Sequence, residues 1–427
     1  MAEKRKLLIV SAYFAPDRAV GAKRFTYLCE IFEARGYEVS VLTMKGRCTE
    51  DRTLPIAGTA YRCAPLFQPV NVMHPLPKGT RFAKLYNRML GKWLCFPDSH
   101  IGWLWSAVRE GLRIIKDRKC DLIVATAPPY SSLIAGALLS RMSGKRLVLD
   151  YRDPWTARDW TGVRAGRWVS GINAWMERMV VRRAEAAVFV TEPMRKDFQR
   201  RWGATTTARL HIIANGYHNR VHIDAIRPDN DGRLSIVYAG HLYGERRVGL
   251  IAEPLAALIA EGRLAPNAVA IHVFGGGVQS DDERRMDDLG LSGVLVKHDP
   301  VNHATILRYL RGADLLYLPS GRDVRYALPF KLFDYLSVRV PILAVAPKDS
   351  AVADFMREVD CGEIADIDDP QSVRDALSNL LLVRKQYTFR GAERYTWDAI
   401  ALRYMGVLDK DLVCTARTGD VFIPDKV

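Results

Sequence analysis

A lysine and an aspartate stand three residues apart in the apolar segment 327–347, "ALPFKLFDYLSVRVPILAVAP". Pro329 suits the first position of a helix, so Lys331 would lie in the first turn, where the helix macrodipole disfavours a cation. A bound anion removes this conflict, so the pattern predicts a phosphate beside Lys331. Asp334 on the same face could accept hydrogen bonds from ribose hydroxyls. The alternative is an i,i+3 ion pair worth only about 0.2–0.5 kcal/mol.

Glycines and arginines follow the strand-like segment "LSIVYA" in the second half of the chain. Gly240 and Gly244 stand in the next turn, and Arg246 and Arg247 come directly before a helix-like stretch. Arginine stays charged and binds phosphate through two parallel hydrogen bonds, so this pattern predicts a diphosphate site. For one of the two arginines, a solvated surface position is the alternative. A second turn, "FGGG", adds Gly276, whose backbone could meet a nucleobase or a phosphate, or form a plain flexible turn.

Charged residues also end an apolar run in the first half of the chain, within "LDYRDPW". Ligands of parallel α/β sheets bind at the carboxyl ends of the strands. We therefore predict that Arg152 and Asp153 face a substrate, where a carboxylate can meet hydroxyls or a developing positive charge. The structural alternative is an ion pair of Arg152 with Asp150 or Asp153 that braces the loop.

The loop "FAPDRAVGAKR" places Gly21 just before a helix that we expect to begin near Lys23. A glycine there lets the backbone approach a ligand, and the helix start offers free N–H groups to an anion. A single glycine is not the G-x-G-x-x-G fingerprint of dinucleotide-binding proteins. Taken alone, the loop is better explained as an ordinary turn.

Apolar strand-like runs alternate with helix-like segments along the whole chain. Examples are "KLLIV", "DLIVATA" and "RLVLDY" in the first half, and "AVAIHVF" and "VPILAVA" in the second. This alternation is typical of α/β domains with parallel sheets. A polar stretch within residues 216–232 separates the halves and reads as a linker. The sequence thus predicts two parallel α/β domains that face each other across a cleft.

The composition indicates a globular protein with an anionic partner. Its 427 residues suit two domains, and 48% hydrophobic residues exclude extended disorder. We expect no transmembrane helix and no signal peptide, and the seven scattered cysteines fit free thiols in a reducing compartment. A cytoplasmic protein is therefore expected. The net charge of +14 indicates phosphorylated small molecules, an anionic membrane surface or nucleic acid. Nucleic acid ranks lowest, since no recognition motif is present.

Residues 75–96 form a basic and apolar segment with helical spacing. An amphipathic helix of this kind can lie on an anionic membrane, where lipid-linked acceptors are found. Packing of its apolar face against the first sheet is the alternative. The residues predicted to meet the membrane surface are Arg81, Lys84, Arg88, Lys92 and Trp93.

The chain resembles bacterial family 4 glycosyltransferases, which are retaining enzymes of the GT-B fold with two Rossmann-like domains. The resemblance runs over nearly the full length. It rests on five short segments in order, "LDYRDPW", "VTEPM", "NGY", "YAGHLYGER" and "KLFDYLSVRVPILA". Each segment alone is weak evidence for the family, but the five segments in this order are strong evidence.

The resemblance implies an α/β protein with an acceptor-binding domain over residues 1–215, a linker over 216–232 and a nucleotide-sugar-binding domain over 233–390. A C-terminal helix within 391–427 is expected to cross back to the first domain, followed by a tail. The implied reaction moves a sugar from a nucleotide-diphosphate sugar, with retention of anomeric configuration, to a glycan or lipid-linked acceptor at the cytoplasmic face of the inner membrane. No metal or other cofactor is expected, since basic side chains and helix dipoles can stabilise the leaving diphosphate.

Individual roles follow from the same resemblance. Arg246 would neutralise the donor diphosphate, Lys331 would lie near the phosphates or the sugar, and Asp334 would hold the ribose. The implied catalytic residues are Asp153, Arg152 and Lys331. The implied donor-binding residues are Gly21, Gly240, Arg246, Arg247, Gly276, Pro329, Lys331 and Asp334.

Two departures from the family pattern keep other functions open. Tyr326 stands where the first acid of the family's E-x7-E motif would fall, and Asp334 is one methylene shorter than the usual second glutamate. One alternative is a UDP-sugar 2-epimerase of the same fold, for which His241 and His298 are the candidate acid/base groups. The other is a catalytically silent subunit that binds a nucleotide sugar.

Overall fold

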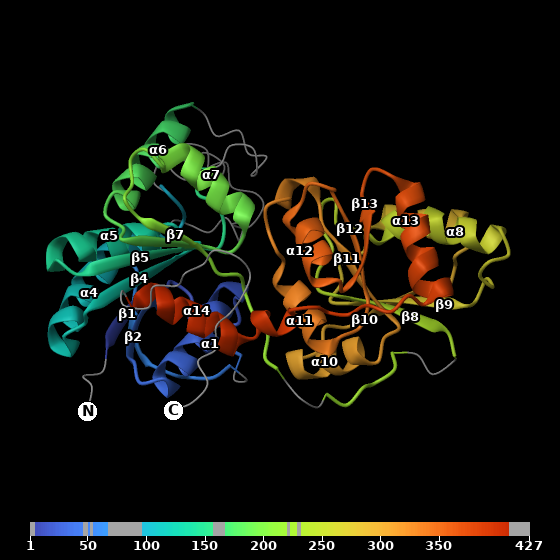
Figure 1. Ribbon diagram of the computed structural model, residues 1–427, viewed down its shortest axis with the longest axis horizontal. Coiled ribbons are helices and arrows are strands. Elements are labelled where there is room, and N and C mark those ends of the chain that lie inside the picture. The colour runs from blue at the N-terminus through green and yellow to red at the C-terminus, as the bar shows by residue number, and fades with distance from the viewer. Residues whose placement is uncertain are drawn as a thin grey trace, which may run out of the picture.

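The computed structural model describes residues 5–45, 50–51, 54–66, 96–156, 167–219, 223–228 and 232–409. They form two α/β domains, each built around one parallel sheet (Figure 1). The predicted fold class, two parallel-sheet domains of the GT-B type, is confirmed.

The first domain contains a seven-stranded sheet with the strand order β3-β2-β1-β4-β5-β6-β7. Residues such as Leu8, Val124 and Leu149 are fully buried because helices cover both faces. The strands are β1 (Lys6–Val10), β2 (Glu38–Met44), β3 (Thr59–Cys63), β4 (Leu122–Ala127), β5 (Arg146–Tyr151), β6 (Ala186–Phe189) and β7 (Arg209–Ile212).

Two layers of helices cover this sheet. One layer is formed by α4 (Leu104–Arg118), α5 (Ser131–Ser143), α6 (Arg167–Val181) and α7 (Glu192–Trp202), and the other by α1 (Val20–Ala34) and α14 (Trp397–Leu408). Helix α1 begins three residues before the position expected near Lys23, since Ala19 is its N-cap residue. Gly21 therefore lies inside the first turn of α1 rather than ahead of it.

The second domain contains a six-stranded sheet with the order β10-β9-β8-β11-β12-β13. The strands are β8 (Leu234–Ala239), β9 (Val269–Phe274), β10 (Leu295–His298), β11 (Leu315–Pro319), β12 (Ile342–Ala346) and β13 (Gly362–Asp366). One face carries α10 (His303–Arg311), α11 (Phe330–Val338) and α12 (Ala351–Val359). The other carries α8 (Ala252–Ala260), α9 (Ser280–Asp288) and α13 (Pro370–Leu377).

The chain crosses between the domains twice, and the two crossing segments hydrogen-bond to each other. The backbone N–H of Tyr217 donates to the carbonyl of Tyr395 at 2.9 Å, and that of Trp397 donates to the carbonyl of Tyr217 at 2.9 Å. After the second crossing, α14 packs beside α1 on the first domain, although the two helices lie at opposite ends of the chain (Figure 1). The side chain of Tyr404 is fully buried there.

A further contact joins the domains at the carboxyl ends of their strands. The hydroxyl of Thr191, just after β6, donates to the backbone carbonyl of Tyr326 at 2.7 Å. The side chain of Tyr326 packs into the hydrophobic core of the first domain, although the residue follows β11 of the second. Loops after the strands of both sheets therefore meet at this junction.

Candidate donor and acceptor site

The first turn of α11 holds Lys331 in a largely buried position. Helix α11 begins at Phe330, and Pro329 is its N-cap residue rather than its first helical residue. The Lys331 ammonium donates to the Tyr238 hydroxyl at 2.5 Å and lies 3.9 Å from the centroid of that ring. Burial, and next the positive charge of Arg246, lower the pKa of Lys331 to about 7. A buried cation with a lowered pKa gains from a nearby anion.

Asp334 does not form the ion pair that was the alternative to an anion site. Its Oδ1 atom lies 2.9 Å from Nε2 of His303 on α10, and its side chain is 21% exposed. Within the described ranges, no salt bridge joins Lys331 to Asp334. Lys331 therefore interacts with Tyr238, whereas Asp334 interacts with His303. The ribose-binding role of Asp334 stays a prediction.

Close packing of the turns after β8 and β9 requires their glycines. Gly240 has φ +124°, and a Cβ atom there would lie 2.7 Å from Nζ of Lys331. Gly275 has φ +118°, and its Cβ would lie 2.8 Å from the carbonyl oxygen of Gly240. Gly276, predicted to contact the donor, follows with φ +90°. The Lys331 ammonium thus lies directly against the bare backbone of the turn after β8.

The two neighbouring arginines have different partners. The Arg246 guanidinium stacks over the Tyr243 ring, 4.4 Å from its centroid, and donates to the Tyr243 hydroxyl. Arg247 instead forms an ion pair with the buried carboxylate of Asp282 on α9, with an Nη2–Oδ1 distance of 2.6 Å. Arg246 is therefore the arginine whose charge acts on Lys331, and the donor-binding roles of both arginines stay predictions.

On the side of the first domain, Arg152 braces the start of α1. Its Nη1 donates to the carbonyl of Gly21 at 2.9 Å, and its Nη2 donates to the carbonyl of Pro128. A Cβ at Gly21 would lie 2.9 Å from Nη1, so the glycine allows this approach. Burial lowers the pKa of Arg152, although Asp150 and then Asp153 oppose the shift.

Asp153 is largely buried at the junction of the two domains. Burial raises its pKa, and the charge of Arg152 opposes this. After burial, the negative charge of Asp153 is the largest cause that raises the pKa of Tyr326. The residue at the position of the missing family acid therefore lies close to the carboxylate that was predicted to face a substrate.

Asp150, the third charged residue of this strand end, belongs to a buried network that the sequence did not reveal. Its Oδ2 atom accepts from Arg24 at 3.0 Å and from the Tyr404 hydroxyl of α14 at 3.2 Å. Arg24 also donates to the carbonyl of Ala214 at 2.7 Å. This network ties α1, β5 and α14 together, and its members lie too far apart in sequence for any spacing rule.

Tyr238 and His303, the partners of Lys331 and Asp334, were also missed. Tyr238 sits within the apolar run of β8, where the alternation of residue types suggests only a buried strand residue. His303 lies in the first turn of α10 beside the N-cap Asn302. No sequence signal within either segment pointed to α11.

Other expectations concern membranes and metals. Arg81, Lys84, Arg88, Lys92 and Trp93 lie outside the described residues. In the described part of the chain, no helix is long and apolar enough to cross a bilayer. The same part contains no cluster of three or more histidine, cysteine or acidic side chains suited to a metal ion.

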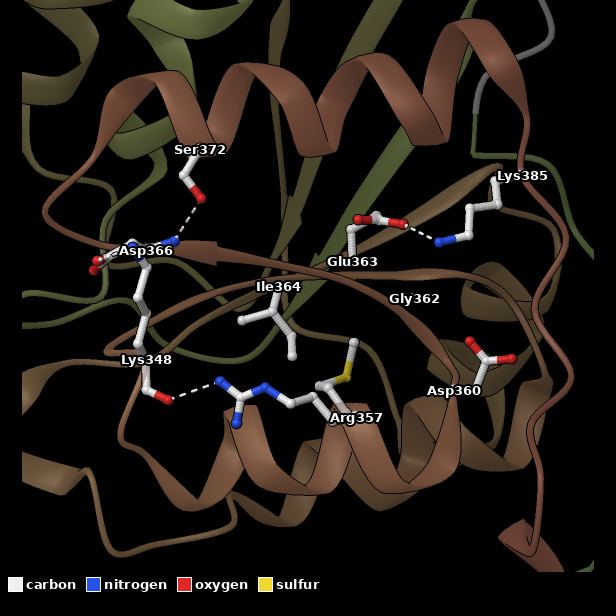
Figure 2. A pocket seen from close by; sticks show the side chains of 10 residues that line it. Lys348, Arg357, Asp360, Gly362, Glu363, Ile364, Asp366, Ser372 and Lys385 are labelled. Atoms are coloured by element: carbon white, nitrogen blue, oxygen red, sulfur yellow. Dashed lines mark hydrogen bonds and ion pairs between the residues drawn. The ribbon is translucent and has the colours of Figure 1, made fainter.

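A hollow of about 350 Å³ lies elsewhere, along the edge strand β13 between α12 and α13 (Figure 2). Its charged groups already have partners: Lys385 donates to Glu363 at 2.9 Å, and Arg357 donates to the carbonyl of Lys348 at 2.9 Å. Neither Lys331 nor Asp153 is among the residues that line it. We therefore place the candidate site at the domain junction and not in this hollow.

Comparisons with known proteins agree with the fold. Residues 21–216 match the model of the glycosyl transferase 4-like domain. No curated protein matches the sequence significantly.

Solved structures match nearly the whole chain at low identity. Sucrose-phosphate synthase from Thermosynechococcus elongatus is 17% identical with a TM-score of 0.61, over 97% of this chain and 100% of that one. The apo form of OtsA is 12% identical with a TM-score of 0.65, over 95% and 99%. The lipopolysaccharide outer core galactosyltransferase WaaB is 11% identical with a TM-score of 0.58, over 95% and 99%. Residues 21–216 thus match the glycosyl transferase 4-like domain model, and the chain shares the two-domain GT-B fold of these solved structures.

Proposed function

We propose that the chain is a retaining glycosyltransferase that moves a sugar from a nucleotide-diphosphate sugar to a lipid-linked intermediate of a surface glycan. It would work at the cytoplasmic face of the membrane. The second domain would hold the donor, and the first would hold the acceptor. The observation that carries this proposal is Lys331, a buried cation at a helix start that faces the glycine turn after β8 and lies near Arg246.

The chemistry of this site suits a diphosphate. The backbone of Gly240 allows close approach, the start of α11 offers free N–H groups, and Lys331 and Arg246 supply positive charge. Positive groups fixed in this way would stabilise the charge that develops on the departing nucleotide diphosphate. A solved structure described as trehalose-6-phosphate from E. coli bound with UDP-2-fluoro glucose shares the fold, with a TM-score of 0.59 and 12% identity.

Asp153 supports the catalytic part of the proposal. It lies where loops from both domains meet, and none of the described residues forms a side-chain hydrogen bond with its carboxylate. A carboxylate in that position could stabilise positive charge on the transferred sugar, as carboxylates do in glycoside chemistry. Arg152, whose guanidinium holds the turn at Gly21, would act by positioning the loop.

The 2-epimerase alternative draws less support. Nε2 of the candidate histidine His298 lies 2.9 Å from Nδ1 of His272. The His298 ring also stacks on the Phe274 ring, with a distance of 4.2 Å between the ring centroids. These contacts embed His298 among the strands of the second sheet. His241 is exposed in the turn after β8, with its Nδ1 3.5 Å from the carbonyl oxygen of Gly275.

Incubation of the full chain with a panel of UDP-, GDP- and dTDP-sugars tests the proposal. We expect slow release of the nucleoside diphosphate from one donor, and a released sugar whose first-formed anomer, followed by proton NMR, keeps the donor configuration. An inverted first anomer would refute retention. An epimerised sugar would favour the 2-epimerase, and binding without any turnover would favour the silent subunit.

A further inference from the structure

Helix α6 carries a stripe of exposed apolar side chains. Trp168, Ile172, Trp175 and Met179 are 83%, 39%, 59% and 50% exposed, respectively. Their spacing of four, three and four residues places them on one face of the helix. Trp168, Gly171, Ile172 and Trp175 also line an open hollow of about 600 Å³. A soluble surface rarely leaves such a stripe uncovered, so it indicates an interaction site.

The opposite face of α6 holds the loop that bears Asp153. Nε1 of Trp155 donates to Oδ1 of Asn173 at 3.1 Å, and the hydroxyl of Thr156 donates to the carboxylate of Glu177. Arg201 of α7 pairs with the same carboxylate at 2.8 Å. The apolar stripe is therefore the outer side of a helix whose inner side holds the loop that bears Asp153.

The charges around the stripe favour an anionic partner. Glu177 is the only acidic residue of α6, and it is fully buried against Arg201. Arg178 and Arg182 are exposed at the C-terminal end of the stripe. The outer face of α6 thus presents tryptophan, aliphatic and arginine side chains without a carboxylate, which is the composition of a helix that lies in a membrane interface.

The size of the stripe fits a bilayer better than a second copy of the chain. Four partly exposed side chains offer on the order of 500 Å² at most, against roughly 800 Å² per partner in a standard protein interface. Two positive stripes facing each other would also bring like charges together. Binding to a bilayer does not require a complementary protein surface, because each tryptophan side chain can insert into the lipid interface independently.

We infer that the outer face of α6, formed by Trp168, Ile172, Trp175 and Met179, docks on an anionic lipid bilayer and so brings the Asp153 loop to a lipid-linked acceptor. This inference rests on the proposed function for its biological meaning. The docking itself can be measured without any transfer reaction. It adds a contact surface distinct from residues 75–96.

Sedimentation of the full chain with lipid vesicles tests the docking. We expect binding to vesicles of phosphatidylglycerol and phosphatidylcholine, and at least tenfold weaker partitioning for the double variant Trp168→Ser with Trp175→Ser. Trp105→Ser is the matched control, because Trp105 is 69% exposed on α4. It should bind vesicles as the wild type does. Arg178→Glu with Arg182→Glu keeps the apolar stripe and should also weaken binding, most strongly at low salt.

Two further readouts make the result decisive. Thermal stabilisation by a nucleoside diphosphate should be the same in the wild type and all these variants, which shows that they fold and separates docking from donor binding. Equal vesicle binding by the wild type and the tryptophan double variant would overturn the inference. So would a wild-type dimer in analytical ultracentrifugation that becomes a monomer in the double variant, since the stripe would then bind a second copy.

Discussion

The ammonium group of Lys331 lies 2.5 Å from the hydroxyl of Tyr238, while the carboxylate of Asp334, three residues along the same helix, lies against His303. Among the described residues, Lys331 forms no ion pair with a carboxylate. A phenol and a ring face compensate a buried cation only in part. The donor diphosphate of the proposed reaction would supply the missing negative charge.

Replacing Lys331 by methionine should stabilise the nucleotide-free protein. The change removes a buried, poorly compensated cation and keeps most of the side-chain volume, so the free energy of unfolding should rise by about 1–4 kcal/mol. Urea denaturation at pH 7 measures this. A lower free energy of unfolding in Lys331→Met would show that the ammonium stabilises the empty site.

The pH dependence should reveal the lowered pKa of Lys331, which is about 7 in the folded protein and 10.5 ordinarily. The cost of burying the lysine is present in full below about pH 7 and disappears as the pH rises towards 10.5, since the unfolded chain then also loses the proton. A bound diphosphate raises this pKa again, so binding at pH 8 should take up nearly one proton and binding at pH 6 almost none.

Titration calorimetry in buffers of different ionisation enthalpy measures the proton uptake. Lys331→Met is the control and should show none at pH 8. Equal uptake by the wild type and the variant would assign the proton to another group.

Replacing Gly240 by alanine should damage the donor site. The backbone there has φ +124°, and the new Cβ would lie 2.7 Å from Nζ of Lys331, so the lysine must move. We expect nucleotide affinity to fall at least about tenfold, together with a loss of roughly 1–3 kcal/mol in stability. Gly244→Ala is the matched control, because Gly244 also has positive φ, +58°, but its Cβ would meet no atom within 4 Å. Equal nucleotide affinity in the two variants would contradict the close contact with Lys331.

Arg246→Ala should weaken nucleotide binding, whereas Arg247→Ala should lower the stability of the fold. Arg247→Ala leaves the buried carboxylate of Asp282 unpaired, which should cost about 1–3 kcal/mol of stability with little change in nucleotide affinity. Arg246→Ala should leave stability nearly unchanged and reduce the thermal stabilisation by nucleoside diphosphates. Thermal unfolding with and without the nucleotide separates the two effects. The reverse pattern would assign the donor contact to Arg247.

Asp153→Asn should impair turnover rather than donor binding. The substitution keeps the shape but removes the charge, and we expect kcat to fall roughly 100-fold or more, as when one charge-stabilising group is removed elsewhere. Asp150→Asn is the contrasting variant, because it breaks the buried pair with Arg24 and should lower stability instead. Measurement of both the rate of donor hydrolysis and the nucleotide affinity of each variant distinguishes a catalytic role from a structural one. Unchanged kcat in Asp153→Asn would remove this residue from the catalytic set.

The sequence was sufficient for central strands such as β4 and β12, because these are runs of apolar residues buried on both faces. It also predicted the unusual position of Lys331, since a cation in the first turn of a helix conflicts with the macrodipole whatever the fold. The start of α1 was placed three residues late, because Ala19 caps the helix without a capping side chain.

The partners of the site residues could not be predicted. Tyr238 stands 93 residues before Lys331, and Arg24 stands 126 residues before Asp150. Such pairs are created by the packing of whole elements and leave no local pattern. For the same reason, the sequence could not show that Arg152 would bind the backbone carbonyls of Gly21 and Pro128 rather than a neighbouring carboxylate.

The most direct test of the donor site is calorimetric titration of the wild type, Lys331→Ala and Arg246→Ala with UDP, GDP and dTDP. We predict that at least one nucleoside diphosphate binds the wild type. Each variant should lose at least about 2 kcal/mol of binding free energy, roughly 30-fold in Kd, while its circular dichroism spectrum stays unchanged. Equal affinity in the wild type and both variants would contradict the site, and so would the absence of any binding to the wild type.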